Sequence, residues 1–207
     1  MVGLLFEGIY LYYHWPRRDE LHSVSDTGTH LVGEENSAVE QPSVENKQVE
    51  KEPPLPEEVN LDIPFTSQAP FSDWSYPFNH TCEEAAVLMA HYYVEGKTSI
   101  EPAQAKKELL ALVEYENKNY EFSEDTNAAQ TAQLIRDYYG YSVKVKYDIS
   151  LDDIKKELAK GNPVIVPTAG RLLNNPYFKR PGPLYHMLLI KGYNATDFIT
   201  HDAGTVR

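Results

Sequence analysis

The only cysteine of the chain, Cys82, lies where the spacing of residues indicates the start of a helix. Thr81 is a favoured N-cap residue, and Glu84 follows three positions later, which is the spacing of a capping box. The residues through about position 93 lack glycine and proline and include several strong helix formers. Cys82 is therefore predicted to be the first helical residue, where the helix dipole and unpaired amides favour a thiolate nucleophile. The alternative is a buried cysteine that acts as a small apolar side chain.

A cysteine nucleophile needs a base, and the chain has seven histidines. Three belong to an N-terminal tail that is not expected to face a core: His14, His22 and His30. His80 is too close in sequence to approach Cys82 easily, and His91 lies about 180° round the same helix. The remaining candidates are His186 and His201.

Strand geometry distinguishes these two histidines. If a turn at residues 194–196 closes an uninterrupted hairpin, Leu188 faces Asp202 and His186 lies diagonal to Asp202 on the same face. His201 then lies on the opposite face. The register predicts a base paired with a carboxylate that orients it, and a slip of one residue would reverse the assignment. The alternatives are a core histidine at position 186 and a turn aspartate at position 202.

Acyl transfer also needs hydrogen-bond donors for the oxyanion. The amide of Cys82 at the helix start is one candidate, and Gln68, in the loop just upstream, is the best side-chain candidate. An ordinary polar loop residue is the alternative for Gln68. Trp74, in the same aromatic-rich loop, and Tyr185, beside His186, are the candidate substrate-binding residues. The spacings of the cysteine, histidines and aspartate match no zinc pattern, so neither a metal nor an organic cofactor is expected.

The elements that must position these residues come in a simple order. Helices are predicted over residues 82–93, 100–117, 126–139 and 150–161, and strands over residues 141–145, 163–166, 185–193 and 197–202. The intervening segment 168–184 is long and rich in glycine, proline and asparagine, which is typical of a functional loop. Helices followed by strands favour an α+β fold in which the Cys82 helix packs on an antiparallel sheet.

The first third of the chain is predicted to lie outside this domain. Residues 1–18 form an apolar segment, too short for a full membrane span, that we interpret as the remnant of an anchor or as an interfacial patch. Residues 19–58 form an acidic, proline-rich linker that is predicted to be disordered, and the domain covers residues 59–207. Residues 1–58 are therefore expected to add little stability. An anchor would give a membrane-tethered, extracytoplasmic domain, whereas Arg17 and Arg18 favour the cytoplasm.

Composition narrows the range of partners. The formal net charge is -12 and the sequence has no basic patch, which argues against nucleic-acid binding. A single cysteine excludes an intramolecular disulfide. The expected partner is a peptide or a peptide-like substrate.

Several segments occur in an order that a known family shares: residues 63–70 (IPFTSQAP), Trp74, and residues 82–85 (CEEA), 161–167 (GNPVIVP), 182–186 (GPLYH) and 202–205 (DAGT). In these segments the chain resembles the bacterial papain-like cysteine peptidases related to the double-glycine leader peptidases of bacteriocin exporters. The resemblance implies a papain-like fold, with Cys82 as nucleophile, His186 as general base and acid, Asp202 as orienting residue and Gln68 as oxyanion donor.

Two departures from that family shape the expectation. The chain has no P-loop motif and no membrane span of an exporter, so leader cleavage during export is not implied. Relatives continue with more sheet beyond the position of Asp202, so the chain is expected to be a C-terminally incomplete fragment. The sequence thus predicts a cysteine peptidase. The alternative is a catalytically silent module of the same fold that binds peptides or cell wall on a flexible tether.

Overall fold

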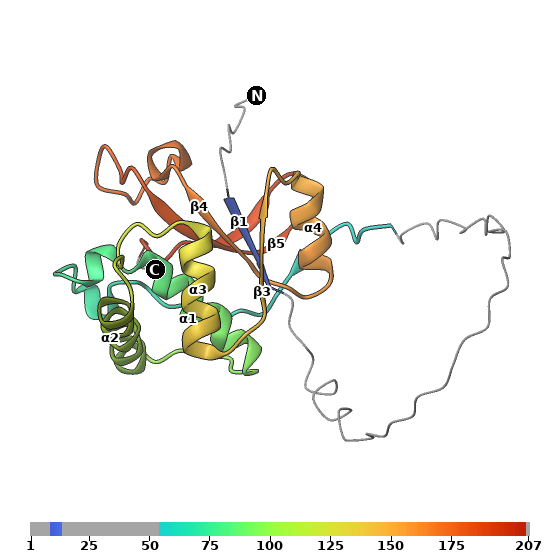
Figure 1. Cartoon of the computed structure of the whole chain (residues 1–207). Coiled ribbons are helices and arrows are strands. Elements are labelled where there is room, and N and C mark those ends of the chain that lie inside the picture. Colours follow the sequence, from blue (N-terminus) through green and yellow to red (C-terminus); the bar gives the residue numbers. More distant parts are fainter. Residues whose placement is uncertain (1–8, 14–53, 206–207) are drawn as a thin grey trace, which may run out of the picture. The chain divides into compact units, whose positions relative to one another are not determined.

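The computed structural model describes residues 9–13 and 54–205 of the 207-residue chain. Most of the predicted linker, and the histidines at positions 14, 22 and 30, lie outside these residues. Within them a mixed sheet-and-helix domain is formed (Figure 1). None of its helices is both long enough and apolar enough to cross a membrane.

One antiparallel sheet forms the centre of the domain. Its strands run in the order β2-β5-β4-β1-β3, and β6 pairs with β5 beside this path. The strands are β1 (Ile9–Tyr13), β2 (Val59–Asn60), β3 (Val143–Tyr147), β4 (Val164–Thr168), β5 (His186–Tyr193) and β6 (Phe198–His201).

The helices begin and end close to their sequence signals. They are α1 (Cys82–Val94), α2 (Pro102–Asn119), α3 (Ala128–Tyr139) and α4 (Leu151–Ala159). Pro102 stands in the first turn of α2, where its missing N–H costs nothing. Gly140 ends α3 in the left-handed conformation that glycine adopts without a steric penalty. Ser150 and Asp153 form the predicted capping box of α4.

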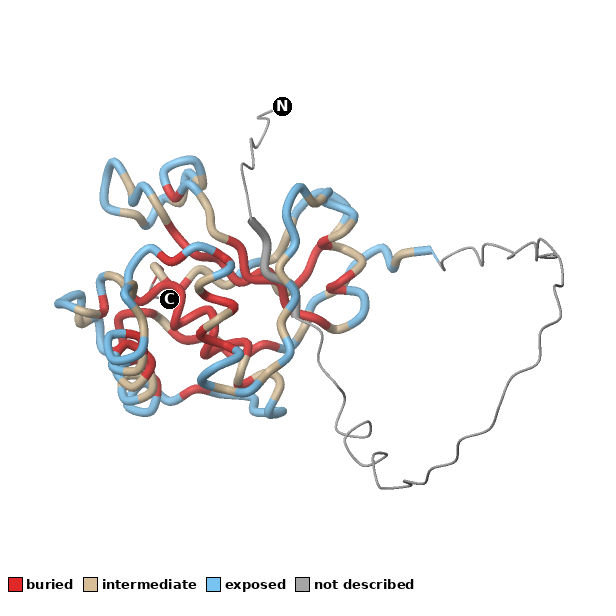
Figure 2. The backbone as a smooth tube through the Cα atoms, in the orientation of Figure 1, coloured by how far each residue is buried: buried red, intermediate tan, exposed pale blue. Residues whose placement is uncertain are grey.

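Both faces of the sheet are covered. On one face α1 and α3 pack on the sheet, in a core cluster that includes Ile165, Met187 and Leu189, and α2 packs on α1. On the other face α4 packs in a cluster with Val164, Leu188 and Ile190. Neighbouring residues of β4 and β5 therefore point into different clusters, as the two-residue period of a strand requires. Figure 2 shows the buried residues concentrated in α1 and in these two strands. The prediction of an α+β fold with α1 packed on an antiparallel sheet is confirmed.

The β5–β6 hairpin has the predicted register at the end farther from its turn. Ile190 pairs with Thr200 and Leu189 pairs with His201. A bulge between Ile190 and Gly192 then shifts the pairing by one residue toward the turn. The hairpin is thus interrupted, contrary to expectation, but the interruption lies on the turn side of the pairs that set the position of His186.

The predicted boundary of the domain is corrected at its N-terminal side. Ile9–Tyr13, which fall in the segment interpreted as an anchor remnant, form β1 and pair with β3 on one edge and β4 on the other. Five consecutive β-branched, aromatic or leucine residues suit a strand in a sheet covered on both faces. The end of the predicted linker also contacts the sheet, because the Tyr193 hydroxyl donates to the carbonyl of Pro56, just before β2 pairs with β5.

Two carboxyl groups are buried together where α1 packs on α2. Glu84 and Glu116 are 1% and 0% exposed, and their side chains interact with each other. We call them the acid pair. Burial raises the pKa of both carboxyls above its ordinary value, and the negative charge of neighbouring carboxylates disfavours their ionisation further. The pair therefore retains a proton that the unfolded chain would release.

Deletion of residues 1–15 should destabilise the domain, because the facing edges of β3 and β4 would lose their hydrogen-bond partner. We expect the Tm, measured by circular dichroism, to fall by roughly 5 °C or more, which corresponds to about 2 kcal/mol for a domain of this size. Deletion of residues 1–8, which leaves β1 in place, is the control. An unchanged Tm in the longer deletion would contradict the placement of β1.

Because the acid pair is protonated in the folded domain, we expect the free energy of unfolding to decrease as the pH rises. Groups whose pKa is raised by folding contribute stability that is fully present below their unfolded pKa, about 4.3 for glutamate, and is lost as pH rises through the folded pKa. Glu116→Gln replaces a titrating carboxyl with a neutral group of the same shape. The variant should lose less stability than the wild type between pH 5 and pH 8, by about 1 kcal/mol or more in urea titrations. Glu114→Gln, an exposed position on the same helix, should behave like the wild type.

Candidate active site

Cys82 is the first residue of α1, as predicted, but the capping box is not formed. The Thr81 hydroxyl does not accept from the helix. It donates instead to the carbonyls of Gln68, at 3.0 Å, and Phe78, at 3.3 Å. Glu84 is turned into the acid pair, so it cannot reach back to the cap. The start of α1 is therefore fixed by the preceding loop and by burial.

The Cys82 thiol is buried, at 6% exposure, and hydrogen bonds to a carboxylate. Its Sγ donates to Oε2 of Glu83 at 3.0 Å. Burial, followed by the negative charge of Glu83, raises the pKa of the thiol well above its ordinary value, although a hydrogen bond from the Met187 backbone acts in the opposite direction. The structure therefore holds a protonated thiol, whereas the helix start alone predicted a thiolate.

Glu83 is itself held by the segment that precedes α3. Its second oxygen, Oε1, accepts from the amide of Thr126 at 2.7 Å, and the Tyr185 hydroxyl donates to the Thr126 carbonyl at 2.6 Å. Burial raises the pKa of the Glu83 carboxyl above its ordinary value, whereas the hydrogen bonds that both of its oxygens accept favour the ionised form. This network joins the start of α1 to Tyr185, the residue just before β5.

The predicted pair of His186 and Asp202 is formed. Nε2 of His186 lies 2.7 Å from Oδ1 of Asp202, and the imidazole is 3% exposed. Because a carboxylate only accepts, Nε2 carries the proton of the neutral ring and Nδ1 is left with its lone pair. Nδ1 makes no hydrogen bond to any of the described residues. His186 is thus held as a base with one nitrogen available.

Asp202 receives three hydrogen bonds. Besides His186, Nδ2 of Asn175 donates to its Oδ2 at 2.6 Å, and the amide of Gly204 donates to its Oδ1 at 2.9 Å. Burial by itself would raise the pKa of this carboxyl, but the donors outweigh burial and the pKa is lowered. Asp202 therefore stays ionised, as an orienting partner of His186 requires.

The surroundings of the imidazole leave little free space. Phe178 packs edge-on against His186, with ring centroids 5.2 Å apart. A Cβ atom on Gly204 would lie 3.0 Å from Cε1 of His186, and one on Gly170 would lie 2.7 Å from the side chain of Pro183. Glycine at positions 170 and 204 thus allows the loops to close around the ring, which fixes its orientation.

Gln68 lies beside the start of α1 and is 4% exposed. Its Nε2 donates to the carbonyl of Phe78 at 3.0 Å, and its backbone amide donates to Ala203, next to Asp202. One of the two hydrogens on Nε2 remains for another acceptor. Of the two predicted substrate-binding residues, Trp74 is exposed, whereas the hydroxyl of Tyr185 is engaged with Thr126.

The structure brings the predicted residues together around one junction, between the start of α1 and the start of β5. Cys82 contacts the backbone of Met187, the residue after His186. The thiol hydrogen bonds to Glu83 and not to His186. The other histidines of the described residues are engaged elsewhere: His80 with Glu124, His91 with Tyr141, and His201 with the carbonyl of Ile63.

Three residues of this site were not identified from the sequence: Glu83, Asn175 and Phe178. Asn175 and Phe178 belong to segment 168–184, where the length and composition did indicate function, but no periodicity showed which side chains turn inward. Glu83 would ordinarily be interpreted as a solvated charge in the first turn of a helix. Its burial depends on the segment near Thr126, distant in sequence.

Comparison with models of protein families gives a match over most of the domain. The sequence model of the Peptidase_C39 like family matches residues 60–206, a range that contains all the site residues described above. No curated protein and no solved structure matches the chain significantly. Among the described residues, no group of three or more His, Cys, Asp and Glu side chains is arranged to hold a metal ion.

The Glu83 contact predicts how the thiol should respond to a change of charge. Glu83→Gln removes the negative charge beside Sγ, so the pKa of Cys82 should fall. The rate of alkylation by iodoacetamide follows the thiolate fraction and should rise at pH 7 by about tenfold for each unit of that fall.

The midpoint of the rate–pH curve is the quantity to compare. Local unfolding would also lower this midpoint, toward a free value of about 8.5, so the comparison is made with a variant that keeps the wild-type Tm by circular dichroism. Glu84→Gln is the matched control, since this neighbouring buried carboxyl faces Glu116. Equal midpoints for the wild type and Glu83→Gln would contradict the assignment.

Proposed function

Because this chain belongs to the Peptidase_C39 like family, we propose that it is a cysteine peptidase that hydrolyses peptide or related amide bonds through an acyl-enzyme. The observation that carries the proposal is the 2.7 Å hydrogen bond between Nε2 of His186 and Asp202, which leaves Nδ1 as a base beside the helix that bears Cys82. A module that only binds peptides has no need of a buried base, an orienting carboxylate and a thiol at one junction.

The reaction begins with removal of the thiol proton. In the resting site this proton is directed at Glu83, so the first step is transfer of the hydrogen bond from Glu83 to Nδ1 of His186. Asp202 stabilises the imidazolium that forms. Burial, which favours the neutral thiol when the imidazole is neutral, favours a thiolate once its counter-ion lies in the same low-dielectric site.

Bond making and breaking then proceed in two stages. Sγ of Cys82 bonds to the carbonyl carbon, the C–N bond breaks, and His186 gives its proton to the leaving amine. Water then attacks the thioester and gives a proton to His186, the C–S bond breaks, and the proton returns to sulfur. The two stages need no reagent other than water and leave the protein unchanged.

The developing oxyanion has two candidate donors. The amide of Cys82 is in the first turn of α1, where it lacks a partner within the helix. The second Nε2 hydrogen of Gln68 is the other, because its first is given to Phe78. The bond to Phe78 also fixes the amide plane of Gln68, so that the remaining donor is oriented before substrate arrives.

A peptide library tests the proposed activity across many candidate sequences at once. The full chain is incubated with a proteome-derived peptide mixture, and new termini are identified by mass spectrometry. Cleavages that disappear in Cys82→Ala support a cysteine peptidase. The absence of any Cys82-dependent cleavage, from a chain shown to be folded by circular dichroism, would refute the proposal for peptide substrates.

The two histidines of the hairpin provide a sharper test. His186→Ala should reduce the cleavage rate of the best library peptide by at least ~100-fold, the lower range for general acid–base catalysis. His201→Ala should cost stability through loss of its bond to Ile63 and its packing on Phe65, but little activity per folded molecule. Asp202→Asn should fall between them, because it keeps the shape and loses the charge. An inactive His201→Ala with an active His186→Ala would exclude this assignment.

A further inference from the structure

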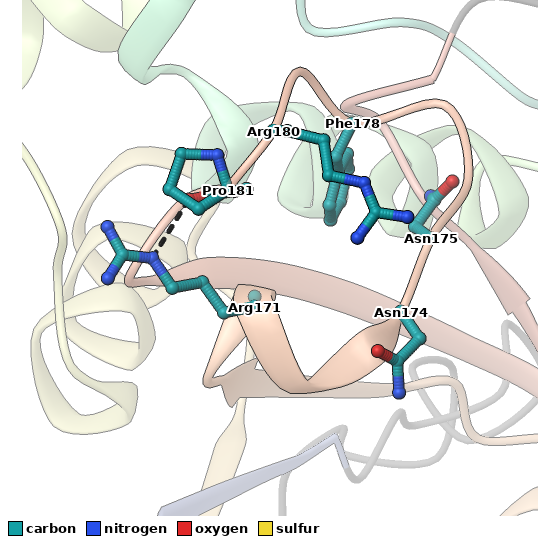
Figure 3. A pocket seen from close by; sticks show the side chains of 8 residues that line it. Arg171, Asn174, Asn175, Phe178, Arg180 and Pro181 are labelled. Carbon is teal, nitrogen blue, oxygen red and sulfur yellow. Dashed lines mark hydrogen bonds between the residues drawn. The ribbon is translucent and has the colours of Figure 1, made fainter.

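The segment between β4 and β5 contains a small pocket next to the His186–Asp202 pair (Figure 3). Its volume is about 100 Å³, and it is lined by residues 170, 171, 174, 175, 178 and 180–182. Two of these also support the base: Asn175 donates to Asp202, and Phe178 packs on His186. Whatever occupies this pocket is therefore one side chain away from the proposed catalytic pair.

The charge around the pocket is opposite to that of the whole chain. The formal net charge is -12, yet residues 161–196 contain neither aspartate nor glutamate. The same stretch contains Arg171, Lys179, Arg180 and Lys191. Asp202, the carboxylate that touches the pocket through Asn175, is ionised, but its oxygens already accept three hydrogen bonds and it lies behind Asn175. The pocket thus lies in a locally cationic part of an anionic protein.

Neither arginine has an acidic partner among the described residues. Nε of Arg171 donates to the carbonyl of Gly182 at 3.1 Å, which orients the side chain and leaves its two terminal nitrogens for another acceptor. Arg180 makes no hydrogen bond or ion pair within the described part of the chain. Figure 3 shows its guanidinium passing Phe178 and directed toward Asn175. A planar guanidinium with spare N–H groups matches the two oxygens of a carboxylate.

Large apolar side chains of the same segment are exposed. Tyr177 and Leu184 are each 72% exposed, and Leu172 is 60% exposed. Exposed apolar groups beside unpartnered cations suit an occupant that carries both apolar side chains and negative charge. A peptide has this combination, whereas an inorganic anion does not.

From this geometry we propose that the pocket is a subsite for a carboxylate of the peptide substrate, bound by Arg180, with Arg171 adding positive charge on the Pro181 side of the pocket. The carboxylate is either an acidic side chain or the C-terminus of the peptide. The inference deepens the proposed function and rests on it. The subsite would hold an acidic peptide beside His186, in a protein whose overall charge otherwise repels acidic peptides.

A binding experiment tests the subsite separately from catalysis. The full chain with Cys82→Ala, which cannot form an acyl-enzyme, is titrated by NMR with three probes. They are acetyl-Leu-Glu-Leu-amide, acetyl-Leu-Gln-Leu-amide, and acetyl-Leu-Gln-Leu with a free C-terminal carboxylate. We expect the charged probes to shift the signals of Arg180 and Asn175 and to bind more tightly than the neutral probe. The first and third probes distinguish an acidic side chain from a C-terminus.

Charge-removing variants then assign the preference to residues. In the same background, Arg180→Gln should weaken binding of the preferred charged probe by roughly three- to fivefold, the upper range for an exposed ion pair. Binding of the neutral probe should not change. Lys179→Gln is the matched control, because it removes one neighbouring positive charge that does not line the pocket. The preference should also decline as salt is raised, since both arginines are exposed.

Equal affinity for all three probes, or an equal loss in Lys179→Gln and Arg180→Gln, would overturn the subsite. Neither result depends on cleavage. If the peptide library shows Cys82-dependent cleavage while the titrations show no charge preference, the subsite fails and the proposed function stands. If the titrations succeed and no cleavage occurs, the carboxylate site stands and the peptidase assignment fails.

Discussion

The start of α1 is buried against the first residues of β5, and this burial determines the protonation of every group nearby. A thiol, an imidazole and the carboxyls of Glu83 and Glu84 lie at or beside one junction with little contact with water. In such a medium an isolated charge is costly, so each ionised group must have partners. Asp202 has three donors, Glu83 has two, and Glu84 stays protonated beside Glu116. The arrangement of hydrogen bonds follows from this requirement.

The low polarity of this buried junction also affects which group accepts the proton of Cys82. Two acceptors compete for the proton of Cys82: the oxygen of Glu83 that now holds it, and Nδ1 of His186. A neutral thiol on a carboxylate places one charge in the buried site, and a thiolate with an imidazolium adds a pair of opposite charges. Which arrangement is lower in free energy depends on how much water remains around the sulfur. In the proposed peptidase, entry of a peptide would displace water from around the sulfur, which would couple substrate binding to activation of the nucleophile.

Local signals in the sequence located most of the elements, and the register of one hairpin located His186 and Asp202. This worked because Ile190 and Thr200 keep the simple pairing, and the bulge falls on the turn side of them. The sequence failed wherever a distant segment determined the outcome. Thr81 and Glu84 have the spacing of a capping box, but a buried neighbour on α2 competes for the carboxyl. The pKa of Cys82 was predicted in the wrong direction because the helix start alone was considered, without the burial of the thiol and the carboxyl of Glu83 beside it.

The position of β1 also bears on the order in which the molecule can be assembled. Ile9–Tyr13 are synthesised well before their partners, because β3 and β4 lie more than a hundred residues later in the chain. The sheet therefore cannot close on both edges of β1 until almost the whole domain has been synthesised. Contacts this distant in sequence carry a loop-closure cost before they stabilise anything, which slows folding. Until then the edges of β1 are open to other strands, including those of a second nascent chain.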